Sequence, residues 1–254
     1  MIYKKAQVAV FVIFAIIIVS LVIVYFLFFQ KQGTSIISTG EFNAQEYVSQ
    51  CVRDRLSEGV DKSLPQGGIF NPRDYRQYQG KKIPYLCKNI NYYDACINQY
   101  PRYIVTLQDE LHNYLGSRID GCFNSLKAEL EKRKYSIKDD NNKNFEVVLE
   151  PDFVEVKMQR KISFNKDASS TSLDDFSSKL RSPLYDLSLV TQNVVSQEAR
   201  FCYFETAGFN LLYPKTDVRR ATLSDYTRIY NIKDKASGKQ LNMAIRGCAI
   251  PAGF

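Results

Sequence analysis

Residues 6–29, "AQVAVFVIFAIIIVSLVIVYFLFF", form a stretch of 24 residues without a charged side chain. As an α-helix it would be about 36 Å long, enough to cross a hydrocarbon core of about 30 Å with some tilt. A cleavable secretory signal has a shorter apolar region that ends in small residues, whereas the flank here, "VYFLFFQKQG", is bulky and aromatic. The stretch therefore predicts a transmembrane or pilin-like helix and disfavours a cleaved signal.

The charges on either side of this stretch predict its orientation. Lys4 and Lys5 precede it and Lys31 alone follows it. Because positive charge tends to remain on the cytoplasmic side, residues 1–5 are expected in the cytoplasm. We therefore expect a single-pass protein of the cell membrane whose partner is the lipid bilayer. The bulk of its chain is expected to be extracytoplasmic.

Six cysteines follow the apolar stretch, and none has the C-x-x-C spacing of a zinc site. An even number on the exported side indicates up to three disulfides, although six cysteines allow 15 connectivities and the sequence does not choose among them. The alternative is buried free thiols in a reducing compartment, which would reverse the topology. Our working pairs are Cys51–Cys122 between two helices, Cys87–Cys96 across a short loop, and Cys202–Cys248 between the last helix and the last strand.

The exported domain is expected to begin after a neck at residues 30–40, which is rich in Gly, Ser and Thr. Within the domain, 41–254, the part 41–135 is predicted to be mainly helical. Two segments, 42–64 and 105–137, have apolar residues at steps of three and four, which is typical of amphipathic helices.

Between these helices lies an irregular, proline- and tyrosine-rich loop at residues 66–103. Tyrosine offers a large contact area at low entropic cost, so the loop is a candidate contact surface. The alternative is that the rings cover the helix beneath them. The candidate contact residues are Tyr75, Tyr78, Tyr85, Tyr92, Tyr93 and Tyr100.

The second half of the domain, residues 145–254, predicts a strand hairpin, a long helix and a C-terminal hairpin. "FEVVLE" and "FVEVKMQRKISF" alternate with period two around the turn "EPD". Residues 172–204 are expected to form the helix, capped by Ser172 and Asp175 and kinked or restarted at Pro183. The fold class expected is α+β: an N-terminal transmembrane helix, then amphipathic helices packed on an antiparallel sheet of about four strands.

Charge and residue content give little sign of chemistry. The net charge of +7 is spread along the chain without a basic stripe, so no nucleic-acid partner is expected. His112 is the only histidine, and with Asp109 three residues earlier it is interpreted as a solvated helix residue. We expect no catalytic residue, no cofactor and no metal.

Two resemblances add to this interpretation. "KKAQVAVFVIF" resembles the N-terminus of archaeal type IV pilin-like proteins, which implies cleavage after Ala6 and a mature chain beginning at Gln7. Ala9 and Phe11 stand where that pattern prefers a serine and a glutamate. The run "CVRDRL", "PQGGIF", "IPYL", "IDGCF", "YNIKD" and "LNMAIR" is similar to uncharacterised single-span surface proteins of archaea, a resemblance that implies no activity.

The leading hypothesis is a membrane-anchored, pilin-like structural or assembly protein of the cell surface. It would self-associate through residues 7–29 or join other surface proteins, and an extracellular filament is one form that this assembly could take. The alternative is a membrane-tethered adhesion or complex-binding module that forms no filament. A tethered enzyme is a third hypothesis, and it would have to use His112.

Overall fold

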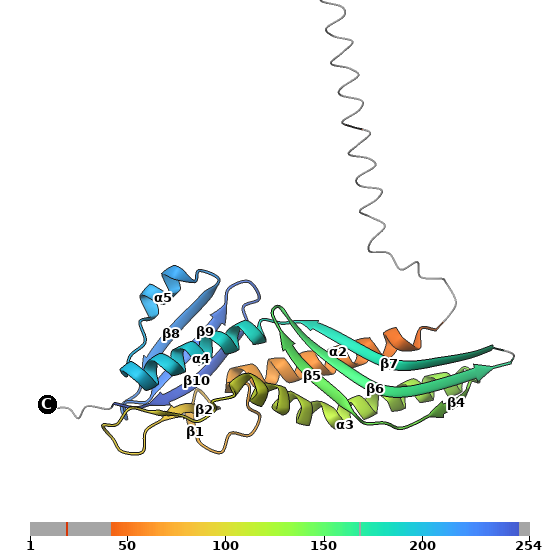
Figure 1. Ribbon diagram of the computed structural model, residues 1–254, viewed down its shortest axis with the longest axis horizontal. Helices are drawn as coiled ribbons and strands as arrows, with labels where there is room; N and C mark the ends of the chain where they lie inside the picture. The colour runs from red at the N-terminus through yellow and green to blue at the C-terminus, as the bar shows by residue number, and fades with distance from the viewer. Residues whose placement is uncertain (1–18, 20–41, 168, 249–254) are drawn as a thin grey trace, which may run out of the picture. The chain divides into compact units, whose positions relative to one another are not determined.

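The computed structural model describes residue 19, residues 42–167 and residues 169–248. The chain divides into two compact units, Met1–Asn43 and Ala44–Phe254. The helices and strands discussed below all belong to the second unit, which Figure 1 shows in colour.

The predicted N-terminal features lie outside the described residues, apart from Val19. These features are the cytoplasmic segment 1–5, the apolar segment 6–29, the neck 30–40, and the processing residues Ala6 and Gln7. Among the helices that are described, none is both long enough and apolar enough to cross a membrane.

Fifteen short and long elements make up the described part of the second unit. The helices are α2 (Ala44–Ser63), the 3-10 helix η2 (Leu64–Gln66), α3 (Tyr103–Lys132), α4 (Leu184–Phe201) and α5 (Thr206–Leu212). The strands are β1 (Tyr75–Tyr78), β2 (Lys81–Lys88), β3 (Ile97–Asn98), β4 (Ser136–Asp139), β5 (Phe145–Glu150), β6 (Phe153–Lys166), β7 (Ser169–Arg181), β8 (Thr216–Thr222), β9 (Arg228–Asp234) and β10 (Gln240–Arg246).

The predicted fold class is wrong, because it expected one antiparallel sheet of about four strands. The described residues form ten strands in two sheets. The first is a mixed sheet in the order β1-β2-β10-β9-β8, with β3 also on β2. Its β2 and β10 are parallel, whereas its other pairs are antiparallel. The second sheet is wholly antiparallel and is built around the long strand β6.

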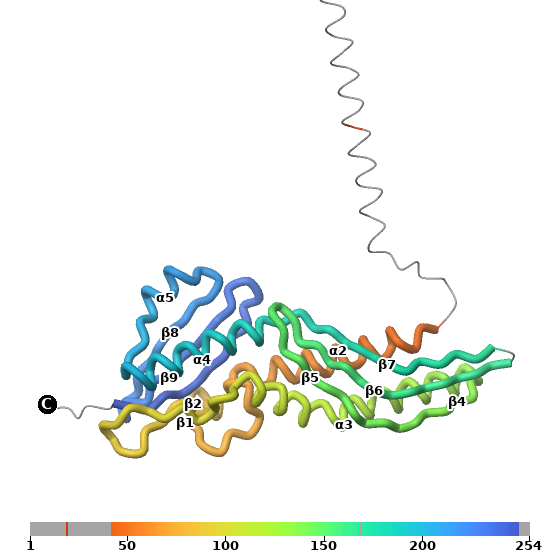
Figure 2. The backbone as a smooth tube through the Cα atoms, in the orientation of Figure 1, coloured from red at the N-terminus to blue at the C-terminus, as the bar shows by residue number. Residues whose placement is uncertain are grey.

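The antiparallel sheet follows the alternation that the sequence predicts for its first two strands. The hairpin β5–β6 is confirmed, with Glu150 opposite Phe153 across a two-residue turn. Along β6 the even-numbered side chains from Val154 to Phe164 are buried. β7 pairs along one edge of β6, while β5 and β4 pair with successive parts of the other edge; Figure 2 traces β6 and β7 as two long neighbouring strands.

Residues 169–181 form strand β7, so the prediction of a helix starting at Ser172 is wrong there. Ser172 lies opposite Ser163 in the β6–β7 ladder, and Phe176 and Ser178 turn inward. The side chain of Ser178 donates to the Ser49 carbonyl of α2 at 2.8 Å, which ties the strand to that helix. Pairing along β6 therefore overrides the local capping pattern, and the helix begins only after Pro183, as α4.

The two predicted amphipathic helices are confirmed as α2 and α3, and they cover one face of the antiparallel sheet (Figure 1). α2 packs against β7, and α3 packs against β4 and β5. The buried stripe of α2 contains Val48, Val52 and Leu56, each fully buried at steps of four. Phe123 of α3 meets Phe176 of β7 edge to face at 5.1 Å between ring centroids.

Helix α4 packs against both sheets. It contacts β2, β9 and β10 of the mixed sheet, and also β5, β6 and α3. Its buried side chains include Leu187, Val194 and Val195. The hairpin β9–β10 beneath it confirms the predicted C-terminal hairpin, whereas β1, β2, β3, β4 and β8 were not predicted. The segment expected to be helical to residue 137 ends as a helix at Lys132, and Ser136 and Ile137 belong to β4.

Candidate contact surface

The six candidate tyrosines do not share one environment. Tyr85 is only 6% exposed, and its hydroxyl lies 3.1 Å from the Thr227 hydroxyl in the core of the mixed sheet. Tyr78 and Tyr100 are half-buried. Tyr75, Tyr92 and Tyr93 are exposed, and Tyr93 is the most open of the three at 62%. The structure therefore leaves three of the six at the surface and removes Tyr85 from it.

The loop that carries Tyr92 and Tyr93 is held at both ends. It joins β2 to β3 and is closed by the disulfide Cys87–Cys96, whose Cα atoms are 5.2 Å apart. The Asn89 side chain donates to the Tyr92 carbonyl at 2.9 Å. These bonds fix the backbone, so the tyrosine rings are displayed from a constrained loop.

The same loop is also tied to the end of β10. The backbone N–H of Asn89 donates to the Arg246 carbonyl, and that of Cys248 donates to the Asp94 carbonyl, both at 2.8 Å. The guanidinium of Arg246 lies over the Tyr92 ring, 5.8 Å from its centroid. Tyr92 also meets Tyr93 edge to face at 5.6 Å. The loop is thus packed against the sheet on one side and open to solvent on the other.

Two isoleucines that the sequence analysis did not single out extend this exposed area. Ile90 is 81% exposed, and Ile97 of β3 is also exposed. Neither belongs to a periodic apolar pattern, and only their closeness to the cysteines in sequence could have drawn attention to them. We call the tyrosine surface the set Tyr75, Ile90, Tyr92, Tyr93 and Ile97.

A second exposed apolar group lies at the end of α5. Leu211 and Leu212 are 83% and 75% exposed, and Tyr213 and Pro214 next to them are exposed as well. Helix α5 contains no buried residue. We call Leu211, Leu212 and Tyr213 the leucine surface; it was not predicted.

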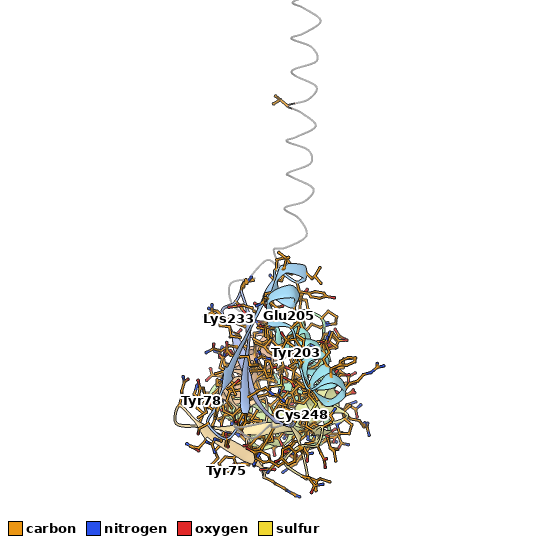
Figure 3. The ribbon with its side chains drawn as sticks, turned by 90° about the vertical axis from the view of Figure 1, so that its left-hand side faces the viewer. Tyr75, Tyr78, Tyr203, Glu205, Lys233 and Cys248 are labelled. Atoms are coloured by element: carbon orange, nitrogen blue, oxygen red, sulfur yellow. A yellow bond between two sulfur atoms is a disulfide. The ribbon has the colours of Figure 1, made fainter. Side chains whose placement is uncertain are left out.

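The two surfaces lie on different parts of the mixed sheet. β1 and β3 occupy the outer edge of β2, while α5 packs on β8 at the opposite edge. Tyr92 contacts Tyr226, which lies beyond the C-terminal end of β8. Tyr213 lies before the N-terminal end of the same strand. Because β8 spans about 20 Å, the surfaces are separated along the strands as well as across them. Figure 3 shows Tyr75 at one side of this end of the domain and Lys233 and Glu205 at the other.

The three disulfides join the pairs expected from the sequence. Cys51–Cys122 links α2 to α3, Cys87–Cys96 closes the tyrosine loop, and Cys202–Cys248 links the end of α4 to the end of β10. Arg228 reinforces the third by donating to the carbonyls of Cys202 and Gly247 at 2.9 and 2.8 Å.

Arg228 also connects this third disulfide to a buried carboxylate. Glu198 of α4 is fully buried, accepts a hydrogen bond from the Tyr230 hydroxyl and lies 3.1 Å from the Arg228 guanidinium. Burial first, and then the bond to the Glu198 carboxylate, raise the pKa of Tyr230. Tyr230 therefore stays protonated and donates at any ordinary pH, which fits a structural role.

His112, the one residue on which an enzyme hypothesis rests, lies exposed on α3. Its ring stacks on Phe145 with centroids 4.2 Å apart. A nearby indentation of about 10 Å³, lined in part by Asp120, Lys143 and Arg160, has room for about one water molecule. Small-molecule sites are usually 300 Å³ or larger, so this indentation is no candidate for one.

Within the described residues, no group of three or more His, Cys, Asp or Glu side chains is arranged to hold a metal ion. Comparisons with protein-family models, with curated proteins and with solved structures find no match to this chain. The candidate site is therefore defined by its exposed side chains alone.

Proposed function

We propose that this chain is an exported, membrane-attached contact module whose tyrosine surface meets a protein partner. The observation that carries the proposal is that five large apolar side chains, Tyr75, Ile90, Tyr92, Tyr93 and Ile97, are exposed on strands β1 and β3 and on the loop that a disulfide closes. Aromatic side chains dominate the energetics of protein interfaces, and a rigid loop loses little entropy when it binds.

Two further features support the location in this proposal. Three disulfides are typical of proteins that fold in an oxidising compartment, outside the cytosol. The uncharged segment 6–29 supplies an apolar length that matches a bilayer.

The test uses cells that display the full chain, with adhesion to cells or isolated envelopes of the same source as the readout. Replacing Tyr92 and Tyr93 together by serine should reduce adhesion about tenfold or more, because central interface aromatics each cost 1 kcal/mol or more when truncated. The matched control replaces Phe153 and Leu189 by serine as well. These two residues are comparably exposed but lie on β6 and α4. Equal adhesion by the tyrosine variant, with an unchanged melting temperature, would reject the tyrosine surface.

A filament subunit is the second candidate, favoured by the basic pair Lys4–Lys5 before Ala6 and Gln7 and by the uncharged segment that follows. Such a segment can pack against copies of itself as readily as against lipid, because it exposes almost no polar group. The mass of the purified chain distinguishes the two candidates. A mature N-terminus at Gln7 with filaments in electron micrographs supports the subunit, and an intact Met1 without filaments supports a plain anchor.

A further inference from the structure

The leucine surface is built to stay exposed. Leu211, Leu212 and Tyr213 are consecutive, and all three are open to solvent at the end of α5. A run of large apolar side chains that no described part of the domain covers marks a surface that meets something else. The occupant must accept a short apolar ridge, since the run covers only one turn.

The backbone beneath this ridge is firmly positioned. The side-chain amide of Asn210 bonds both backbone groups of Val218 in β8: it donates to the carbonyl at 3.0 Å and accepts from the N–H at 2.8 Å. The Thr216 N–H donates to the Tyr213 carbonyl at 3.1 Å. Asn210 thus occupies part of the free edge of β8, and the backbone that carries the leucines is held on both sides of them.

Three lysines lie near the ridge. Lys215 follows it after Pro214, and the Lys235 N–H donates to the Lys215 carbonyl at 3.0 Å, so the two residues lie together. Lys233 is opposite Asp217 in the β8–β9 ladder, at the same end of the strands. All three lysines are exposed, and within the described part of the chain none of them forms a salt bridge.

Two acidic side chains at this corner have partners of their own. Asp217 pairs with Arg219 at 2.8 Å, and Asp234 accepts from the backbone and hydroxyl of Ser237 at 2.7 and 2.6 Å. Asp186, which lies near Lys215, is exposed. The corner thus carries carboxylates as well as lysines, and its distinguishing feature is three exposed lysines that form no salt bridge within the described part of the chain.

From this arrangement we infer that the leucine surface rests on the surface of an anionic lipid bilayer. Leucine and tyrosine side chains enter the boundary between head groups and acyl chains, while lysines beside them meet the anionic head groups. A protein interface core is, in contrast, depleted of lysine. Strands β1 and β3, which carry Tyr75 and Ile97 of the tyrosine surface, lie at the opposite edge of the sheet from β8.

This inference rests on the proposed membrane attachment, which also makes a weak contact sufficient. The uncharged segment ends at Phe29 and helix α2 begins at Ala44, so the link between them cannot exceed about 50 Å. A tether of that length raises the effective concentration of the domain at its own bilayer, and three inserted side chains need not bind from solution.

The absence of tryptophan from the chain allows a direct test. The full chain carrying Leu212→Trp is reconstituted into vesicles containing phosphatidylglycerol, with or without lipids brominated in their acyl chains. We expect a blue-shifted emission that the brominated lipids quench about twofold or more. Ile90→Trp, on the tyrosine surface, is the matched control and should be neither shifted nor quenched.

The lysines are tested in the same background. Replacing Lys215, Lys233 and Lys235 by glutamine should remove most of the quenching at position 212, as should phosphatidylcholine in place of the anionic lipid. Quenching that neither change alters would overturn the role of charge in this contact.

Other results separate the possible failures. A tryptophan at position 212 that stays unquenched in a chain that floats with the vesicles overturns the inference and leaves membrane attachment intact. A blue shift without quenching would mean that protein, such as a second copy, covers the leucines, and it too overturns the inference. A chain that does not float at all refutes attachment through residues 6–29, and the inference falls with it.

Discussion

Arg160 and Asp139 form a two-point ion pair on the covered face of the antiparallel sheet, with Nε–Oδ1 and Nη2–Oδ2 distances of 2.9 and 2.7 Å. Their side chains are only 4% and 6% exposed. Lys127 reaches the same carboxylate at 3.1 Å, and Asp120 accepts from Arg160 at 3.2 Å. A buried guanidinium is thus balanced by carboxylates from two other elements, α3 and β4.

This pair predicts a specific loss of stability in acid. Burial alone raises the pKa of Asp139, but bonds from Arg160, the Asn141 backbone and Lys127 outweigh it and lower the pKa from 3.8 to about 2. A folded pKa below the unfolded one stabilises the protein above the unfolded value, and this stabilisation disappears as pH falls toward the folded value.

Between about pH 5 and pH 2, the free energy of unfolding should therefore fall by about 2 kcal/mol more in the wild type than in Asp139→Asn. Urea denaturation at several pH values measures the difference. Parallel pH profiles for the two proteins would show that the pair contributes nothing.

The disulfides should differ in their contribution to stability. Cys51–Cys122 closes a separation of 71 residues and Cys87–Cys96 one of 9. In the chain-entropy model, the longer loop corresponds to about 4 kcal/mol and the shorter to about 2.5 kcal/mol. Replacing each pair by alanines and measuring urea unfolding tests the order, which a larger loss for the short loop would contradict.

Replacing Gly68 by alanine is expected to destabilise the fold strongly, and the same change at Gly80 provides the control. Gly68 has φ +73°, and a Cβ there would lie 2.1 Å from Cδ2 of Leu107; Gly80 has φ +75° but nothing within 4 Å. Gly68→Ala should cost about 2–4 kcal/mol from backbone strain plus overpacking, against about 1 kcal/mol for Gly80→Ala. Thermal unfolding of both variants measures the difference between their losses of stability. Equal losses would show that the Leu107 side chain moves aside.

Asn210 should protect the edge of β8. Because it bonds both backbone groups of Val218, Asn210→Ala removes two hydrogen bonds, together worth about 1–2 kcal/mol of local stability. The Val218 amide should then exchange with solvent about tenfold faster. Hydrogen exchange compares this variant with Asn193→Ala on the exposed face of α4, and an unchanged rate at Val218 would remove the protective role.

The long helices and the two hairpins could be predicted because their patterns are local. The apolar stripe of α3 repeats over 30 residues, and β9 and β10 meet across a glycine-containing turn. Strand β7 could not be predicted, since its sequence is mostly serine, aspartate and lysine. It is a strand because it pairs with β6. β2 contains Pro84 and a continuous run of buried residues, which no alternation reveals.

The candidate surface was predicted in part for a similar reason. Tyrosine content drew attention to the loop, but composition does not tell Tyr85, which turns into a sheet core, from Tyr93, which does not. The parallel pairing of β2 with the distant β10 decides that difference. The leucine surface escaped notice because a helix of seven residues is too short to show a period.

The proposed function requires a domain that is exported, attached to the membrane and fully disulfide-bonded. Thiol labelling of separated membrane and soluble fractions, with the mass shift read before and after reduction, tests all three properties together. We expect a membrane-bound chain that takes up no label until reduction and then takes up six, one for each cysteine. A soluble chain whose cysteines react at once, without reduction, would contradict it.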